Sequence, residues 1–385
     1  MNVSEEPSPV TLRGVTWGHT RGLLPLIAGS MALSDRTAGR LSIDWEVRSL
    51  WDFGEGDLRP VADTYDLMVI DHPLVADAVD AGLLVPVDSA DDNELRRDAV
   101  GRSQHSYEYG GKAWALAVDA ACQVAVWRPD LLDRAGQSVP VTFDDVLRLP
   151  ASAPVAIPMA PVDLLCTFFS LCATLGETPL ASPAAVVSDE VGQAALDRLS
   201  QLVAKSGTAW LGMNPIDIHR VATSTDRVAY VPFAFGYSNY SRPGFARQQV
   251  HAGPTPAIDG LSRGALGGAG IAISALRPHA SRAVEAARWL TSKECQAGPY
   301  LEAGGQPARR SAWDEATSRN IGPSFFDTTS GAIETAFPRP AERGMRAFQT
   351  AAGELLLKSL KDSTTLPPSL LPRLHALWDP VATPA

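Results

Sequence analysis

The sequence predicts an α/β protein with two lobes, each built on a mixed, mostly parallel sheet flanked by helices. Three observations support this prediction. The chain has 385 residues, whereas a single hydrophobic core stops growing near about 250–300 residues. Strand and helix patterns alternate over roughly seventy residues near the start, which is typical of parallel sheets. Two apolar runs meet at a short polar step beside Asp119, far from both termini, so we expect the chain to cross between lobes there.

The composition is ordinary for a globular protein. Hydrophobic residues make up 45% and charged residues 20% of the chain. No segment approaches the ~18 consecutive apolar residues that a membrane span needs. The formal net charge is −10, so the molecule repels phosphate backbones and anionic membranes. We therefore expect no nucleic-acid partner and no membrane insertion.

Three strands are predicted in the first part of the chain. They cover residues 12–17, 41–50 and 65–70. The second alternates apolar and polar residues, as a half-buried strand does, and the third is apolar from residue 67 to its end. In a parallel sheet, the loops that follow these strands face one edge, which is where α/β proteins bind ligands.

Residues at the ends of these strands, or directly after them, are candidate ligand contacts. They are Trp17, His19, Arg21, Trp51, Asp52, Asp71 and His72. Indole rings suit the flat faces of sugars or other ringed solutes, and Asp and Arg suit their polar groups. A histidine opposite a carboxylate also suits acid–base chemistry, for which His19, His72, Asp52 and Asp71 are the candidates. Hydrogen bonds that only seal the loops are a third interpretation.

No metal or cofactor site is predicted. The histidines and Asp71 lack the spacing of a helical metal motif. The four cysteines lack the spacing of a zinc site, and we expect them to be buried as small hydrophobic side chains. They are Cys122, Cys166, Cys172 and Cys295.

Residues 106–136 form the predicted crossover between lobes. A tight hairpin at Gly110-Gly111 leads into an apolar strand that stops at Asp119, and a second apolar run follows. A helix then begins at Pro129 and is closed by a glycine.

The second lobe is expected to contain more helix than strand. Thr142 and Asp145 form the two halves of a capping box at the start of one helix. Residues 164–175 predict a long buried helix, and residues 189–204 predict an amphipathic one. A helix and then a strand are expected across residues 215–232.

An aromatic cluster follows that strand. Phe233, Phe235 and Tyr237 share one face of an extended chain. We expect this face and Trp210 to meet the ligand, with core packing as the alternative for each ring. Arg21 and Arg242 are available to neutralise an acidic group.

A glycine-rich run, Gly264-x-x-Gly267-Gly268-x-Gly270, comes before the next apolar strand. Glycines that cradle phosphate follow a strand and open a helix, which is the opposite order. We interpret the run as close backbone packing at a junction between lobes, with Gly268 near the ligand.

Four stretches resemble the family 1 (sugar-type) extracellular solute-binding proteins, the binding components of ABC importers. They are YEYGGKAWALAVD with DLLDRAG shortly after it, AGLLVPVD, LTSKECQ and GGQPARRSA. The resemblance covers about residues 12–316, which is most of the chain.

The resemblance implies a type II periplasmic-binding-protein fold that closes on a ligand by bending at hinges near Asp119 and Pro256. It implies that residues 10–118 and 256–310 form lobe 1 and that residues 119–255 and 311–380 form lobe 2. Asp119 is then expected beside the inter-lobe cleft, with Gln123 in the same crossover. The implied ligand is a carbohydrate-like small molecule, with no cofactor. The implied partner is an ABC permease if the protein is secreted.

The start of the sequence lacks the features of a secretory signal. Residues 1–11 contain two glutamates, no lysine or arginine, and no apolar core. As the sequence stands we expect a cytoplasmic protein, and a periplasmic or extracellular one if a leader has been removed. Two cytoplasmic alternatives to the importer role stay open. One is a cofactor-independent lyase, isomerase or cyclase, and the other is a ligand sensor that presents its closed form to a protein partner.

Overall fold

The computed structural model describes residues 8–87, 93–182 and 185–378. The chain divides into two compact units. Unit 1 comprises Met1–Ala99, Tyr107–Ala120 and Gly268–Ala312, and unit 2 comprises Val100–Ser106, Ala121–Gly267 and Trp313–Ala385. Most of residues 1–11, on which the expectation about a leader rests, lies outside the described residues.

Two strands carry the chain from one unit to the other. The first is β6 (Ala115–Trp127), which changes unit at Ala120–Ala121, and the second is β9 (Leu266–Ile273), which changes unit at Gly267–Gly268. The predicted break at Asp119 was wrong, because β6 runs through this position without interruption. A carboxylate is tolerated inside the strand because a buried arginine pairs with it, as described below.

The predicted return to lobe 1 at Pro256 was also wrong. Residues 256–267 belong to unit 2, because the Ala257 amide donates to the Val141 carbonyl (2.8 Å) and the Gln123 amide donates to the Ala265 carbonyl (2.9 Å). Residues 100–106 likewise belong to unit 2 and not, as expected, to lobe 1.

Unit 1 is built on a mixed sheet. β1 (Val10–Trp17) pairs in parallel with β2 (Leu41–Arg48) on one side and with β3 (Leu67–Ile70) on the other. β9 pairs antiparallel with β3. The central strand β3 is buried along its whole length, as its uninterrupted apolar sequence predicts.

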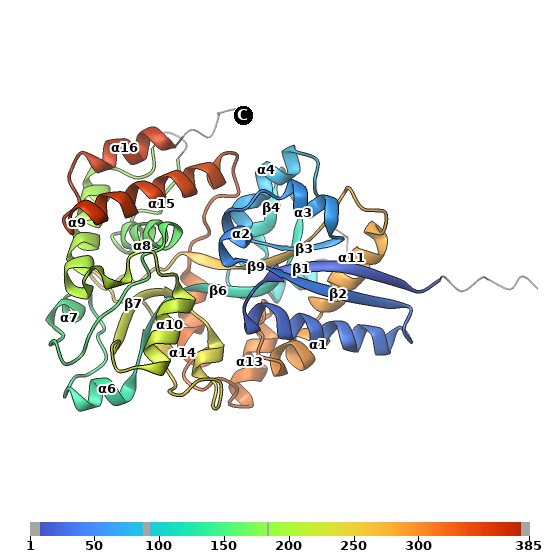
Figure 1. Ribbon diagram of the computed structural model, residues 1–385, viewed down its shortest axis with the longest axis horizontal. Coiled ribbons are helices and arrows are strands. Elements are labelled where there is room, and N and C mark those ends of the chain that lie inside the picture. Colours follow the sequence, from blue (N-terminus) through green and yellow to red (C-terminus); the bar gives the residue numbers. More distant parts are fainter. Residues whose placement is uncertain (1–7, 88–92, 183–184, 379–385) are drawn as a thin grey trace, which may run out of the picture. The chain divides into compact units, whose positions relative to one another are not determined.

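Helices flank this sheet. Figure 1 shows α1 along one side of β1 and β2, and α3 and α4 on the other side. The helices described for unit 1 are α1 (Thr20–Arg36), α2 (Leu50–Glu55), α3 (Arg59–Thr64), α4 (Val75–Asp80), α5 (Asn93–Arg97), α11 (Ala280–Leu290) and α12 (Lys293–Cys295), and α13 (Arg310–Ser318) continues into unit 2.

The predicted hairpin before β6 is confirmed. β4 (Glu108–Tyr109) and β5 (Lys112–Ala113) pair antiparallel across Gly110 and Gly111. Both glycines have positive φ, 57° and 76°, and a two-residue turn that matches the twist of its strands requires this conformation.

Two of the recognisable motifs pack together in unit 1. The Gln296 side chain, from LTSKECQ, accepts a hydrogen bond from the Ala308 amide (2.8 Å) and donates to the Val118 carbonyl in β6 (3.2 Å). Arg309, from GGQPARRSA, donates through Nε to the Thr291 carbonyl (2.7 Å). These polar residues therefore anchor residues 290–311 to the strand that leaves the unit.

Unit 2 differs in its sheet from the mostly parallel arrangement that we expected. β7 (Tyr230–Phe235) and β8 (His251–Gly253) both pair antiparallel with β6. The parallel pairings described in this unit are isolated bridges, such as Val155 with Tyr230.

The core of unit 2 is helical. α8 packs against α9 and α15, and these helices lie together in Figure 1. The predicted capping box of α7 is confirmed, since Thr142 and Asp145 bond each other's backbone amides. The helices described for this unit are α6 (Pro129–Arg134), α7 (Phe143–Arg148), α8 (Pro161–Thr174), α9 (Asp189–Ser206), α10 (Pro215–Ser224), α14 (Phe326–Thr335), α15 (Met345–Asp362) and α16 (Leu370–Leu377).

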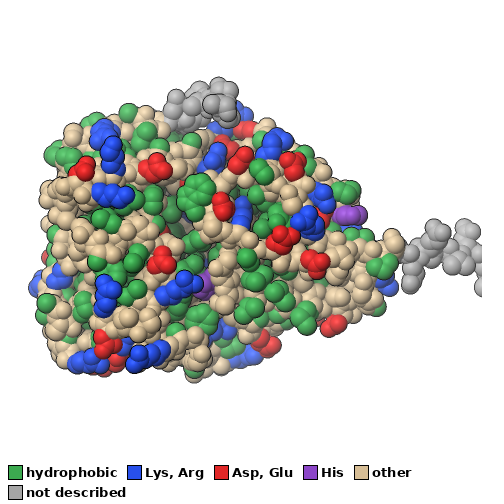
Figure 2. Space-filling view, in the orientation of Figure 1, with side chains coloured by type: hydrophobic (Ala, Val, Ile, Leu, Met, Phe, Trp, Pro, Cys, Tyr) green, Lys and Arg blue, Asp and Glu red, His purple; other side chains and the backbone are tan. Residues whose placement is uncertain are grey.

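The charges on the surface and the lengths of the helices can be compared with what binding to nucleic acid and insertion into a membrane require. On the face shown in Figure 2, acidic and basic side chains intermingle, so this face does not carry the basic stripe of nucleic-acid-binding proteins. Among the helices that the structure describes, none combines the length and apolar character needed to cross a bilayer. All four cysteines are buried and unbridged, as expected.

Candidate functional site

The carboxyl ends of β1, β2 and β3 form one edge of the unit 1 sheet. β1 and β2 are in parallel register along their full length, which ends with Trp17 opposite Arg48. β3 runs in the same direction beside β1. The loops after all three strands therefore meet at this edge, as the sequence predicts, and we call it the carboxyl edge of unit 1.

Trp17 ends β1 but belongs to the core. Its side chain is 4% exposed and packs against Phe53, with the ring centroids 5.1 Å apart. The backbone of Gly22 lies so close to the indole that a Cβ there would overlap it. Trp17 therefore joins α1 and α2 to the sheet.

His19 begins α1. Its Nδ1 accepts a hydrogen bond from the Arg21 amide (3.0 Å), so the side chain caps the helix. The helix starts at Thr20, so the loop between β1 and α1 is only two residues long. When the ring is neutral, its proton lies on Nε2, because Nδ1 is an acceptor.

Arg21 and Asp119 form a buried ion pair. Arg21 Nε donates to Asp119 Oδ2 at 2.8 Å, and Nη2 bonds the second carboxylate oxygen. Both side chains are almost completely inside the protein. Burial raises the pKa of Asp119, and the positive charge of Arg21 opposes that increase. Two expected ligand contacts are thus paired with each other inside unit 1.

Trp51 and Asp52 lie in α2, directly after β2. Trp51 is 60% exposed, in contrast to Trp17. Asp52 accepts hydrogen bonds from the Ser49 hydroxyl (2.6 Å), while its amide donates to the same Ser49 oxygen (3.0 Å). The predicted strand over residues 41–50 was too long, because β2 ends at Arg48 and Ser49 caps a helix that includes Trp51.

Arg48 is a polar residue at this edge that the sequence analysis missed. It donates from Nη2 to the Val69 carbonyl (2.8 Å), whereas its Nε and Nη1 have no hydrogen-bond partner in the described part of the chain. Burial lowers the pKa of Arg48 to about 10, and the charge of Asp52 opposes this. The signal was its place at the end of an alternating strand, three residues before Trp51 and four before Asp52.

Asp71 and His72 follow β3. Asp71 Oδ1 accepts the His72 amide (2.8 Å) and lies 3.1 Å from His72 Nδ1. His72 is completely buried, and its ring meets the edge of Tyr107 with the centroids 6.2 Å apart. The pair thus lies at the predicted edge but beneath the surface.

In unit 2, Gln123 belongs to a buried polar network. Its side-chain oxygen accepts from the Ser170 hydroxyl (2.6 Å), and its amide nitrogen lies 3.4 Å from the Thr167 hydroxyl. Ser170 in turn accepts from the Ala265 amide (2.9 Å). Gln123 therefore links β6 to α8 and to the start of β9.

The aromatic residues of unit 2 are divided between different surroundings. Phe233 is completely buried in β7, and Phe235 is half-buried, with the Arg339 guanidinium 6.0 Å from its ring centroid. Tyr237 lies beyond the end of β7 and packs against His219 (5.7 Å). The prediction of one shared face was wrong for Tyr237, because the strand ends at Phe235.

Trp210 and Arg242 are also mostly inside unit 2. Trp210 is buried, donates from Nε1 to the Ser206 carbonyl (3.0 Å) and lies under the Arg227 guanidinium (5.2 Å). Burial lowers the pKa of Arg242 to about 10.

The glycine-rich run provides close backbone packing, as we interpreted it. A Cβ at Gly268 would clash with the Asp119 carbonyl oxygen, and one at Gly270 would overlap the Tyr107 ring. At the other end of the run, a Cβ at Gly264 would meet the Gln123 carbonyl. Three of these glycines lie inside β9 rather than before it.

Metal binding was considered from the side chains that usually hold metal ions. The described residues contain no group of three or more His, Cys, Asp or Glu side chains placed to hold a metal ion.

Comparison with solved structures relates this arrangement to known proteins. Maltose-bound MalE3 of T. maritima matches with a TM-score of 0.81 at 18% sequence identity, over 94% of this chain and 97% of that chain. The GacH receptor of Streptomyces glaucescens, solved unliganded and with acarbose, matches with a TM-score of 0.78 at 16% identity, over 96% and 97%. A ribitol-bound ABC transporter solute-binding protein of Agrobacterium radiobacter matches with 0.76 at 17% identity, over 97% and 99%.

The chain has the type II periplasmic-binding-protein fold. Coverage of nearly the whole of each chain extends the likeness to both units of this fold. No protein-family model matches the sequence, and no curated protein matches it. The likeness to solute-binding proteins therefore lies in the fold, which persists where sequence identity is below one residue in five.

Proposed function

We propose that this protein binds a carbohydrate-like solute, a sugar or a polyol, at the carboxyl edge of unit 1. The observation that carries the proposal is the exposure of Trp51, 60% of whose side chain faces solvent directly after β2. A large indole left in water at the ligand-binding edge of an α/β sheet is suited to stack on the C–H face of a sugar ring.

Polar groups near Trp51 supply partners for hydroxyl groups. Asp52 is the next residue along α2. Arg48 precedes the helix and adds positive charge, although its Nε and Nη1 are enclosed by the protein. An aromatic face beside a few convergent polar groups is the usual composition of a small-molecule site. The maltose, acarbose and ribitol held by structures of the same fold support this ligand class.

The enzyme alternative receives less support from the positions of its candidate groups. His72 is completely buried, and His19 uses Nδ1 to cap α1. A general acid or base must reach the proton that it transfers, and neither histidine is placed at the surface of the edge.

Calorimetric titration with maltose, acarbose and ribitol tests the proposal. We expect at least one of them to bind and Trp51→Ala to weaken its affinity by up to about tenfold, since aromatic stacking contributes roughly 0.5–1.5 kcal/mol. Met31→Ala is the matched control, because Met31 is 65% exposed but lies far along α1 from this edge. Lack of binding by every sugar and polyol, or equal weakening by both substitutions, would contradict the proposal.

Delivery of the solute to an ABC permease is the role that fits such a binding protein. Hinge bending where the chain crosses between the units remains a prediction from the sequence. Import requires the protein to act outside the cytoplasmic membrane. The genomic sequence upstream of Met1 tests this part: a secretion signal would support import, and its lack would favour a cytoplasmic ligand sensor.

A further inference from the structure

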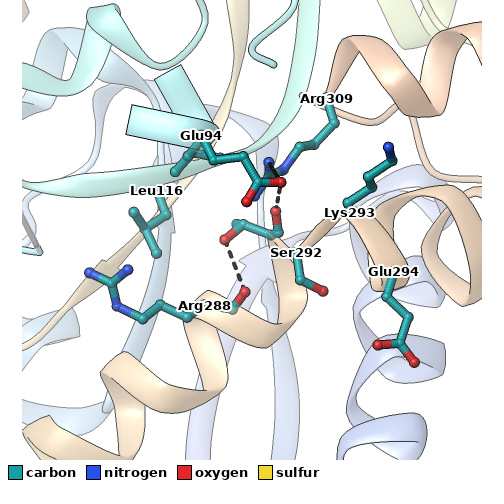
Figure 3. A pocket seen from close by; sticks show the side chains of 9 residues that line it. Glu94, Leu116, Arg288, Ser292, Lys293, Glu294 and Arg309 are labelled. Carbon is teal, nitrogen blue, oxygen red and sulfur yellow. Dashed lines mark hydrogen bonds and ion pairs between the residues drawn. The ribbon is translucent and has the colours of Figure 1, made fainter. Parts of the chain in front are cut away.

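A pocket lies in unit 1 and shares no residue with the carboxyl edge. Its volume is about 350 Å³, which is at the small end of the range for metabolite sites. Its walls come from α5, β6, the end of α11 and the turn into α12, as Figure 3 shows. The lining residues are Glu94, Leu95, Leu116, Arg288, Thr291, Ser292, Lys293, Glu294 and Arg309.

Arg309 is a buried cation with incomplete pairing. Its side chain is 8% exposed, and its Nε donates to the Thr291 carbonyl (2.7 Å). Its Nη1 has no hydrogen bond within the described chain, although carboxylate oxygens of Asp98 and Glu94 lie 3.6 and 3.8 Å away. A buried charge is stabilised fully only when it is both paired and hydrogen-bonded.

Other interactions of Asp98 and Glu94 account for their distance from Nη1 of Arg309. Asp98 already accepts hydrogen bonds from the Ser311 amide (2.9 Å) and hydroxyl (2.6 Å). Glu94 is 76% exposed, so water competes for its oxygens. Both carboxylates therefore pair with Nη1 of Arg309 through their charge, at distances longer than a normal hydrogen bond.

Further positive charge lines the same pocket. Lys293 is exposed beside Arg309 in Figure 3, and no partner is described for its ammonium group. Arg288 lines the opposite wall and donates to the Val87 carbonyl (2.7 Å). The carboxylate of Glu294 pairs with Arg36 outside the pocket (3.5 Å).

We propose that this pocket binds a small oxyanion, the phosphate or carboxylate group of a metabolite, between Arg309 and Lys293. A guanidinium presents a planar fork of N–H donors that matches the oxygens of such groups, and an ammonium adds a mobile point charge. Arg309 contributes its positive charge from the wall of the pocket, where its Nη1 is enclosed by protein atoms.

Titration with inorganic phosphate at constant ionic strength tests the proposal, with citrate as a second arm that distinguishes phosphate from carboxylate chemistry. We expect saturable binding in calorimetry. Lys293→Met should weaken it about threefold or more, because a partly exposed ion pair is lost. Glu94→Gln should strengthen it about threefold, because a competing carboxylate is neutralised.

Lys358→Met is the matched control, since Lys358 is an exposed lysine on α15 in unit 2. It should leave the affinity unchanged. Binding that does not saturate with either anion, or a loss in Lys358→Met equal to that in Lys293→Met, would overturn the proposal. Sugar titrations of the same variants are expected to match the wild type, so failure here is separate from failure of the proposed carbohydrate site.

Discussion

Arg21 and Asp119 come from positions 98 residues apart and meet in a bidentate ion pair inside unit 1. Arg21 lies in the first turn of α1, and Asp119 lies in β6 one residue before the chain leaves the unit. The pair thus fixes the helix that follows β1 to the strand that connects the units.

Removal of one member of this pair should destabilise the protein strongly. We expect Asp119→Ala to lower the free energy of unfolding by about 3–5 kcal/mol, because it leaves an uncompensated buried guanidinium. Urea denaturation measures the change. The control is Glu285→Ala, which breaks the half-exposed pair with Arg282 on α11 and should cost less than about 1 kcal/mol. Equal losses in the two variants would show that Arg21 does not depend on Asp119.

Gly268 should tolerate no side chain. Its φ is +118°, and a Cβ would clash with the Asp119 carbonyl. We expect Gly268→Ala to cost at least about 1–2 kcal/mol from backbone strain alone, with a further loss from the clash. Gly331→Ala is the control, because Gly331 lies in α14 with open space around it. That variant should gain up to about 1 kcal/mol from helix propensity. Thermal unfolding of both variants measures these effects. A melting temperature of Gly268→Ala equal to that of the wild type would show that position 268 accepts a side chain.

Local signals in the sequence were sufficient for many elements of the fold. The capping box of Thr142 and Asp145, the hairpin at Gly110 and Gly111, and the buried strand β3 each depend on residues close together in the chain. Their chemistry is complete within a few residues, so the structure confirms them.

Contacts between residues far apart in the sequence explain the predictions that were wrong. The sequence predicted an end to the strand at Asp119, because a lone carboxylate does not belong in a buried strand, and the distant Arg21 removes that objection. Trp17 and Trp51 were treated alike, since each lies at or just after the end of a predicted strand. Phe53 packs against the indole of Trp17, whereas the indole of Trp51 is exposed. The strand patterns before the two tryptophans did not distinguish them.

The four cysteines should be unreactive in the folded protein. Burial raises the pKa of Cys122 and of Cys295 to about 12 and that of Cys172 well above its usual value. Thiolates are the reactive species, so we expect a thiol-specific colorimetric reagent at mildly alkaline pH to label none of them rapidly. All four should react in denaturant. Fast labelling of any native thiol would show that the element covering it opens readily.

Asp145 should make the stability of unit 2 depend on pH. Hydrogen bonds from the Thr142 amide and hydroxyl, with help from Arg148, hold the pKa of Asp145 well below its usual range. A carboxyl group whose pKa is lower in the folded state stabilises that state above its unfolded pKa, which is near ~4, and loses the contribution as the pH falls. We expect Asp145→Asn to cost about 1 kcal/mol at neutral pH and the difference from the wild type to shrink below about pH 4.

The neighbouring Asp144→Asn is the control for this pH dependence. Asp144 lies in the same first turn of α7 and is exposed, but the reciprocal bonds of the capping box belong to Asp145. Only its interaction with the helix dipole is lost on substitution, which contributes about 0.3–1 kcal/mol at most and falls with added salt. Urea denaturation at neutral and acidic pH, repeated at high salt, separates the two effects. A difference between Asp145→Asn and the wild type that persisted at acidic pH would mean that the carboxylate charge is not what stabilises the cap.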